Sequence, residues 1–189
     1  MKQLYHVFPG VIPSTTCNEI IRRGLLLPSQ EASIGFNNDH LDNSYRKSII
    51  RWFFHREHPD IVQLMMSYAF EANREFFGFD IFPTTWDLQF TEYHANNNGK
   101  YDWHHDVWWT SPRYHDRKLS MVLQLTDRNS YTGGNFEFDL PEINNSELEP
   151  FKTQGSILIF PSFFRHRVTP VTGGIRYSLV TWVEGPKFR

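Results

Sequence analysis

The spacing of hydrophobic residues changes along the chain, from a helical repeat in the first half to alternation in the second. Residues 16–19 match a T-x-x-E capping box, and the apolar residues that follow them predict a short helix. A stronger helix is predicted to begin at Pro59, which suits the first helical position, and to end at Gly78. Its apolar residues recur at helical spacing, which indicates a face packed on a core. We therefore expect two helices that act as scaffold.

Alternating apolar and polar residues predict strands from residue 86 onward. The alternation starts in WDLQFTEY and continues in KLSMVLQL, NFEFDL, SILIF, RHRVTPV and RYSLVTWV. Thr-Gly-Gly occurs at 132–134 and 172–174, each time before a strand, which indicates turns because glycine readily adopts positive φ. The expected fold class is α+β and mainly β. It is a jelly-roll or cupin-like barrel in residues 86–189, with helices of residues 1–85 packed against it as one domain.

Composition and charge narrow the function classes. Aromatic residues make up 16% of the 189 residues, a share that favours strands and large apolar surfaces over a helical bundle. A formal net charge of −2 gives no dense positive face for a phosphate backbone, so we expect no nucleic-acid partner. The single cysteine, Cys17, excludes an internal disulfide. No apolar run is long enough for a signal peptide or a membrane span, so a cytoplasmic protein without membrane contact is expected.

The tripeptide H-x-D occurs three times, and its surroundings differ. The copy at 40–42 lies in a segment rich in Asn and Asp, which mostly serve turns, and the copy at 58–60 lies at the predicted start of a helix. The third copy lies in the extended segment KYDWHHDVWW. Residues two apart in a strand project to the same face, so His104 and Asp106 can grip one ion while His105 points away.

A third metal ligand must come from elsewhere, and His166 is the candidate. It lies in a strand-like stretch between Arg165 and Arg167, which would alternate away from it toward solvent. Arg176 follows ten residues later, on a strand that the predicted turn at 172–174 would fold back beside His166.

An arginine on the inner face of an apolar strand predicts an anionic ligand. By alternation Arg176 shares its face with Ser178 and Trp182. Burying its charge is costly unless an anion meets it, and the planar guanidinium suits a carboxylate held by two hydrogen bonds. The alternative is an internal salt bridge, for which the candidate partners are Glu92, Glu137 and Glu184.

Taken together, the ordered set of H-x-D, His166, a Gly-Gly turn and Arg176 resembles the Fe(II)- and 2-oxoglutarate-dependent dioxygenase superfamily. Within it, the set looks like the prolyl 4-hydroxylase branch, over residues 86–184. The resemblance implies a double-stranded β-helix in which His104, Asp106 and His166 hold Fe(II). It also implies 2-oxoglutarate and O2 as co-substrates, with ascorbate as an optional reductant.

The resemblance also implies a co-substrate pocket. Arg176 would bind the distal carboxylate of 2-oxoglutarate, with Ser178 beside it and Tyr93 lining the site. Gln124 stands where several relatives place a tyrosine that contacts the co-substrate, and the segment HANNNG carries an additional residue. The further pocket-lining candidates are Tyr101 and Trp182.

The implied reaction hydroxylates an unactivated C–H bond and releases succinate and CO2. By the resemblance, the first substrate expected is a prolyl or other residue of a protein or peptide, and a small molecule is the second. Trp108 and Trp109, which follow the metal strand, and the segment at 35–47 are expected to border the substrate entrance. Binding residues concentrate on such loops beside rigid strands.

Two other functions stay open on the sequence alone. One is a cupin-like metal dioxygenase that uses the same triad without 2-oxoglutarate, in which Arg176 would have no obvious purpose. The other is a non-catalytic barrel that binds peptide or carbohydrate through its aromatic side chains. Binding of 2-oxoglutarate separates the implied enzyme from the first. A His166→Ala variant that is inactive but still binds ligand would favour the second.

Overall fold

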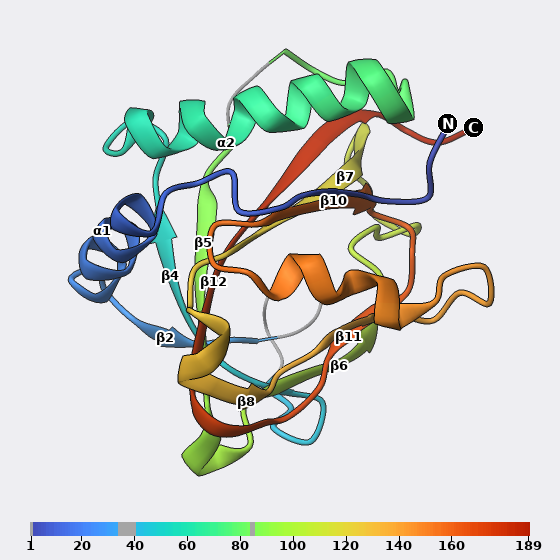
Figure 1. Cartoon of the computed structure of the whole chain (residues 1–189). Coiled ribbons are helices and arrows are strands. Elements are labelled where there is room, and N and C mark those ends of the chain that lie inside the picture. Colours follow the sequence, from blue (N-terminus) through green and yellow to red (C-terminus); the bar gives the residue numbers. More distant parts are fainter. Residues whose placement is uncertain (1, 34–40, 84–85) are drawn as a thin grey trace.

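Two antiparallel sheets face each other in the computed structural model, and two helices pack on the outer face of the larger sheet (Figure 1). The structure describes residues 2–33, 41–83 and 86–189. The N- and C-termini lie close together at one side of the molecule (Figure 1).

Within the described residues, the larger sheet holds eight strands and the smaller sheet four. In spatial order the larger sheet contains β1 (His6–Phe8), β10 (Ile157–Pro161), β7 (His115–Gln124), β12 (Val171–Pro186), β5 (Leu88–His94), β4 (Ile49–Phe53) and β2 (Gln30–Glu31), and β8 (Tyr131–Gly133) pairs with β12. The smaller sheet contains β3 (Arg46–Lys47), β6 (Lys100–His104), β11 (His166–Val168) and β9 (Phe136–Phe138). Neighbouring strands run antiparallel in both sheets.

The second helix follows its predicted repeat closely. α2 (Pro59–Ala72) begins at Pro59, in the first helical position. A π-helical turn, η1 (Asn73–Phe77), carries the chain to Gly78, whose φ of +69° is left-handed and ends the helix as expected. Three short 3-10 turns lie elsewhere: η2 (Ala95–Asn97), η3 (Arg128–Ser130) and η4 (Asn145–Lys152).

The first helix starts earlier than the sequence motif indicated. α1 (Ser14–Leu25) begins two residues before the expected capping box, directly after the extended backbone of Pro13. No side chain caps its first turn, and the carboxylate of Glu19 pairs with Arg22 instead. The capping-box prediction at 16–19 is therefore wrong, because the proline sets the helix start before the motif is reached.

The strands predicted in the second half are confirmed, and the structure adds others. β5, β7, β9, β10, β11 and β12 overlap the six predicted segments, and β7 and β12 extend beyond theirs. Before residue 86 the chain also contributes β1, β2, β3 and β4, which the sequence analysis did not predict. The first three of these are only two or three residues long, too short to show an alternating pattern. The segment before residue 86 thus supplies strands to both sheets as well as helices.

The two Thr-Gly-Gly segments differ in structure. The segment at 132–134 links β8 to β9 with positive φ at both glycines. Residues 172–174 lie inside β12, where pairing with β8 shifts register and Gly174 takes a φ of +69°, so the turn predicted there is wrong. The glycines bend the strand instead of reversing it. As a result Arg176 and His166 reach the site from different sheets, because β12 pairs with β5 and β7 while β11 pairs with β6 and β9.

Both faces of the larger sheet are covered. One apolar cluster lies between the helices and the sheet and includes Met65 and Phe90, both fully buried. Another lies between the two sheets and includes Val122 and Phe160. The central strands are therefore buried on both sides, and polar side chains between the sheets are enclosed by apolar neighbours.

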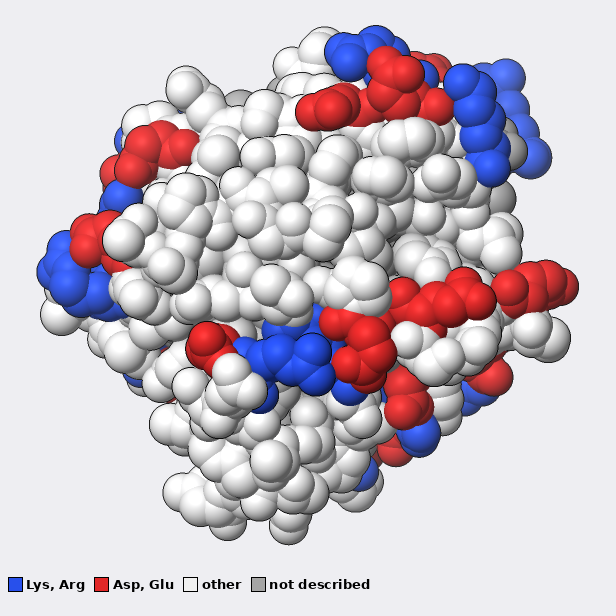
Figure 2. Space-filling view, in the orientation of Figure 1, with Lys and Arg blue, Asp and Glu red and all other residues white. Residues whose placement is uncertain are grey.

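The face shown in Figure 2 carries Lys and Arg in small groups beside Asp and Glu, around a broad uncharged area. Ion pairs such as Arg165 with Asp139 and Lys152 with Glu149 fit this mixed pattern. The visible, described part of this face offers no extended basic area to a phosphate backbone. Within residues 2–33, 41–83 and 86–189, every helix is too short or too polar to cross a membrane.

Gly24 on α1 is expected to resist substitution although alanine is the better helix former. A Cβ at this position would lie 2.9 Å from the fully buried ring of Phe90 on β5. Overpacking of this kind costs about 1–3 kcal/mol, against the ~1 kcal/mol that alanine gains over glycine in a helix. We expect Gly24→Ala to lower the free energy of unfolding in urea and Gly24→Ala/Phe90→Leu to recover part of the loss. Equal or higher stability of the single variant would contradict this contact.

Candidate metal centre and co-substrate pocket

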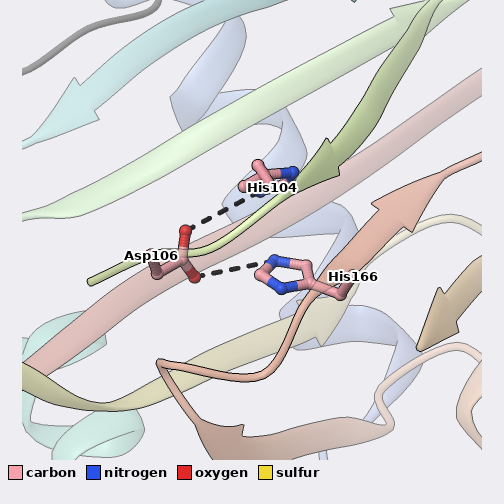
Figure 3. Close-up of side chains that lie close together, drawn as sticks. All are labelled: His104, Asp106 and His166. Carbon is pink, nitrogen blue, oxygen red and sulfur yellow. Dashed lines mark ion pairs between the residues drawn. The ribbon is translucent and has the colours of Figure 1, made fainter. Parts of the chain in front are cut away.

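Two histidines and one aspartate come together where β6 meets β11 (Figure 3). His104, the last residue of β6, is the direct register partner of His166, the first residue of β11. Asp106 follows, and its backbone N–H donates to the carbonyl of Ser162 at 2.9 Å. Nε2 of His104 lies 3.7 Å from Oδ1 of Asp106, and Nε2 of His166 lies 3.6 Å from Oδ2. His105, between them in sequence, is exposed. His104 and Asp106 lie together as alternation along the third H-x-D copy indicated, although the exposed His105 also borders the cavity beside the triad.

Hydrogen bonds on the far side of each ring orient the imidazoles. Nδ1 of His104 lies 2.7 Å from the carbonyl oxygen of Asp102, and Nδ1 of His166 lies 2.9 Å from that of Phe164. A carbonyl oxygen only accepts, so each Nδ1 carries the proton and donates it. Each Nε2 therefore keeps a free lone pair that faces the aspartate, as in histidines that bind metals.

The surroundings hold the three groups in metal-binding protonation states. Burial and the neighbouring His166 lower the pKa of His104 well below its usual value, and burial also lowers the pKa of His166. Burial alone would raise the pKa of Asp106, but the two histidines and Arg117 lower it to about 2. At neutral pH the centre therefore offers two neutral imidazole nitrogens and one carboxylate.

Aromatic rings pack against both imidazoles. The ring of Tyr101 stacks on His104 with centroids 3.5 Å apart and planes 13° apart. Phe136 stacks on His166 with centroids 5.2 Å apart and planes 18° apart. Such packing fixes ligand side chains in position before a metal binds.

The donor set fits a divalent metal that prefers nitrogen and oxygen ligands. Two histidines and a carboxylate form the facial triad of non-haem Fe(II) oxygenases, which leaves coordination positions open. Structural zinc sites, in contrast, are closed and commonly rich in thiolates. In the part of the chain that the structure describes, the cluster contains no cysteine, and Cys17 is buried in the core under the helices.

A cavity of about 190 Å³ opens beside the triad, between the two sheets. Arg176 of β12 lines it and is only 2% exposed, with its guanidinium carbon 5.7 Å from the centroid of the Tyr93 ring. No carboxylate among the described residues forms an ion pair with it.

The glutamates considered as salt-bridge partners of Arg176 are engaged elsewhere. Glu92 pairs with Arg51, Glu137 pairs with Arg167, and Glu184 lies near His115. The internal salt bridge is therefore wrong for Arg176. A buried guanidinium without a counter-charge is the feature expected of an anion site.

The cavity brings together most of the predicted pocket residues. Those that line it are Tyr93, Tyr101, Trp108, Ser178 and Trp182. Gln124 does not, because its buried amide donates to the carbonyl of Thr126 and to the hydroxyl of Tyr131. Its predicted contact with the co-substrate therefore has no support in its position.

Only some of the residues predicted at the substrate entrance line the cavity. Trp108 lines the cavity, but Trp109 is 57% exposed and packs against Phe188 outside it. Of the segment 35–47, residues 35–40 lie outside the described residues. Arg46, near the end of that segment, lines the cavity.

Sequence reasoning missed Arg117, which also lines the cavity. Alternation along β7 from the inward residue Ser120 would point Lys118 inward and Arg117 outward. The pairing of β7 with β12 shifts register just before Glu184, so β7 carries one extra residue there. This bulge reverses the alternation, places Arg117 opposite Glu184, and leaves Lys118 on the ring of Phe188.

Removal of any metal should make the protein lose stability in mild acid. Because the pKa values of His104 and His166 are lowered, the unfolded chain takes up protons near pH 6.5, before the folded chain does. The contribution of the two histidines to the free energy of unfolding is complete above that pH. At lower pH it decreases, by up to about 1.4 kcal/mol per pH unit for each histidine. We expect the melting temperature of chelator-treated protein to drop from about pH 7 to about pH 5, and that of a His104→Gln/His166→Gln variant to drop less. An equal drop in both proteins would contradict buried, neutral histidines.

Ser120→Ala should weaken metal binding without removing a ligand. The Ser120 hydroxyl donates to Oδ2 of Asp106 at 2.6 Å and lies 2.9 Å from the hydroxyl of Ser162. Loss of such an outer partner typically costs about 10–100-fold in metal affinity. We expect the dissociation constant for Zn(II), measured by chelator competition, to rise about tenfold. The matched control is Ser146→Ala, at an exposed serine in η4. Unchanged affinity in Ser120→Ala would show that this bond does not orient the carboxylate.

The amino-acid sequence matches one family of known proteins. The model described as the 2OG-Fe(II) oxygenase superfamily matches residues 88–184, just over half of the chain. A PKHD-type hydroxylase of Synechococcus sp. (strain CC9311) is 46% identical over 91 residues, which are 48% of this chain and 39% of that protein. A PKHD-type hydroxylase of Hyphomonas neptunium is 41% identical over 66 residues, 35% of this chain and 28% of that protein. The matched part thus spans well under half the length of these relatives.

Solved structures show the same fold at low sequence identity. A Pseudomonas putida prolyl-4-hydroxylase has a TM-score of 0.70 and 18% identity, covering 97% of this chain and 94% of that one. The viral collagen prolyl hydroxylase of Paramecium Bursaria Chlorella virus-1, in complex with 2OG, has a TM-score of 0.71 and 16% identity, covering 97% of each chain. A Trichoplax adhaerens prolyl hydroxylase with a peptide fragment has a TM-score of 0.71 and 16% identity, covering 95% of this chain and 83% of that one.

These matches confirm the predicted double-stranded β-helix and its prolyl 4-hydroxylase-like form. The matched family segment contains the whole triad and Arg176. Its description names the metal and the co-substrate that the donor set and the buried arginine would accommodate. The chain belongs to the 2OG-Fe(II) oxygenase superfamily, which implies Fe(II), 2-oxoglutarate and O2 as its cofactor and co-substrates.

Proposed function

We propose that this chain is an Fe(II)- and 2-oxoglutarate-dependent hydroxylase that converts an unactivated C–H bond of its substrate to C–OH. One observation carries the proposal: a two-histidine, one-carboxylate centre shares a cavity with a buried arginine that no carboxylate of the described residues neutralises. The metal centre and the anion site are the two parts that this chemistry requires.

The residues of the chain divide the work between metal and co-substrate. His104, Asp106 and His166 would hold Fe(II), which when bound supplies the redox chemistry that couples O2 to decarboxylation of 2-oxoglutarate and hydroxylation of the substrate. Arg176 would bind the distal carboxylate of 2-oxoglutarate through its planar guanidinium. Ser178, on the same face of β12 and only 1% exposed, offers a hydroxyl to the same end of the cavity. Asp106, His166 and Arg176 are each less than 10% exposed, so the protein itself shields these groups from most solvent contact.

The substrate proposed is a prolyl or other residue of a protein or peptide. Tyr101 stacks on His104 and, with Trp182, gives the cavity flat aromatic walls that suit an apolar ring. Trp108 also lines the cavity and follows the metal strand. The Trichoplax adhaerens prolyl hydroxylase was solved with a peptide fragment, which supports a peptide substrate for this fold.

The two other functions have less support. A cupin-like dioxygenase that does not use 2-oxoglutarate would leave Arg176 buried without a counter-charge. A non-catalytic barrel would leave three ligand groups buried together without a metal. Each arrangement costs free energy that a bound ligand would offset.

Anaerobic titration of the Fe(II)-loaded protein with 2-oxoglutarate tests the proposal. We expect a visible metal-to-ligand charge-transfer band that is lost in His166→Ala. In Arg176→Gln the titration should require at least about tenfold more 2-oxoglutarate, because a hydrogen-bonded charge pair contributes about 1.5–3 kcal/mol. The matched control is Arg22→Gln on α1, an exposed arginine paired with Glu19, which should titrate like the unaltered protein.

The same samples, exposed to O2, should convert 2-oxoglutarate to succinate and CO2, and faster when a prolyl peptide is added. Fe(II) binding without a charge-transfer band would favour the cupin-like dioxygenase. Absence of Fe(II) binding would refute the metal centre.

A further inference from the structure

The cavity extends from the co-substrate end to a second group of polar side chains. Arg176 and Trp182 share the inner face of β12 and lie six residues apart, roughly 20 Å along an extended strand. Trp182 is the register partner of Ser120, whose hydroxyl donates to Asp106, so Trp182 lies level with the metal centre. A 2-oxoglutarate molecule that reaches from Arg176 to the metal would end level with Trp182, whereas Arg117 and His115 lie opposite Glu184 and Pro186, further along β12.

Unsatisfied polar atoms gather in this cavity. Within the described ranges, three buried side-chain atoms lack a hydrogen-bond partner: Nε1 of Trp182, Nδ1 of His115 and Oγ1 of Thr91. All three residues line the cavity. Thr91 is the register partner of Ser178 at the co-substrate end, whereas Trp182 and His115 lie further along the cavity. Buried tryptophan N–H groups normally find an acceptor, so the Trp182 end offers a donor to a ligand that carries acceptor atoms.

Arg117 places a positive charge beside Trp182. Its guanidinium carbon lies 3.8 Å from the centroid of the Trp182 ring. The guanidinium plane is therefore held by stacking, while its hydrogen-bond donors stay available at the edge. Burial lowers the pKa of Arg117, and the carboxylates of Asp106 and Glu184 oppose this effect.

The carboxylates nearest to Arg117 are engaged elsewhere. Glu184, its register partner on β12, lies 3.3 Å from Nε2 of His115. Asp116 accepts a backbone N–H near the C-terminus, and Asp106 belongs to the metal centre. In the described part of the chain none of the three forms an ion pair with Arg117.

Arg46 brings a second uncompensated charge from the opposite sheet. It is 8% exposed and donates to the hydroxyl of Ser48, the carbonyl of Ser33 and the amide oxygen of Gln89. Its guanidinium carbon also lies 4.3 Å from the centroid of the Tyr101 ring. These neutral acceptors satisfy its N–H groups but leave its charge in place, which a bound anion would offset.

We propose that the substrate carries a carboxylate close to the carbon that is hydroxylated, and that Arg117, oriented by Trp182, binds this carboxylate. The inference rests on the proposed hydroxylase function and adds the charge of its substrate. Arg46 contributes positive charge from across the cavity, and Nε1 of Trp182 offers a further donor. The carboxylate belongs either to a free amino acid or to an acidic residue beside the target in a peptide.

Matched pairs of acidic and neutral probes test the inference. The protein is loaded with Zn(II) and saturated with 2-oxoglutarate, so that Arg176 is occupied and no turnover occurs. It is then titrated with N-acetyl-L-proline or N-acetyl-L-prolinamide, and with N-acetyl-Pro-Asp-amide or N-acetyl-Pro-Asn-amide. Binding is followed by tryptophan fluorescence, because Trp52, Trp108 and Trp182 line the cavity. We expect the acidic member of at least one pair to bind about tenfold or more tightly, as expected of a charge-assisted hydrogen bond. The pair that shows the preference identifies a free or a peptide-borne carboxylate.

Variants assign the preference to its residues. Arg117→Gln should abolish the difference between acid and amide, Arg117→Lys should keep part of it, and Arg46→Gln should reduce it by a smaller factor. Melting temperatures establish that each variant is folded, and Arg22→Gln is the surface control.

The inference is overturned if acid and amide bind alike in both pairs, if neither acidic probe shows saturable binding, or if the preference persists in Arg117→Gln. Failure of the hydroxylase proposal is seen separately, as the absence of the 2-oxoglutarate charge-transfer band in the unaltered protein.

Discussion

The antiparallel pairing of β6 with β11 is the constraint on which the site depends. Because His104 and His166 are direct register partners, imidazoles from distant parts of the chain lie side by side, and Asp106 completes the set. A slip of one residue would turn an imidazole to the other face of the smaller sheet. Strands of three and five residues do not hold a register alone, so the packing of residues such as Phe136 and Phe160 between the sheets has to hold it for them.

The same packing buries charged side chains around the cavity, and this lowers the stability of the protein when no ligand is bound. Arg176, Arg117 and Arg46 line the cavity, and no carboxylate among the described residues forms an ion pair with any of them. The pKa of Asp106 is about 2 because His166, His104, Arg117 and the Ser120 hydroxyl outweigh the effect of burial. Uncompensated charge lowers the stability of the ligand-free protein. It also gives the folded protein a strong preference for ligands that restore the balance, because the donors are already oriented and bulk water is excluded. The buried charges thus lower the stability of the ligand-free protein and raise its selectivity for ligands of opposite charge.

Features set by local alternation could be read from the sequence, and features set by pairing partners could not. His104, Asp106 and the inward face of Arg176 follow from the two-residue period of a strand. The sheet to which β12 belongs depends on contacts far along the chain, so the strand with Arg176 was wrongly expected beside β11. The inward position of Arg117 could not be predicted either. It depends on the bulge before Glu184, and a bulge can be recognised only when the pairing of the two strands is known. The capping motif at 16–19 was overridden by the proline just before it.

The substrate end of the cavity draws on a part of the chain outside the family match. The matched residues 88–184 contain the triad, Arg176 and Arg117. Arg46 lies on β3 and reaches the cavity because β3 pairs with β6 beside Tyr101, and Trp52 reaches it from β4. These N-terminal strands line the cavity but contribute none of the three metal ligands. A change in these strands would therefore alter the wall of the cavity that carries Arg46 and Trp52 and leave all three metal ligands in place.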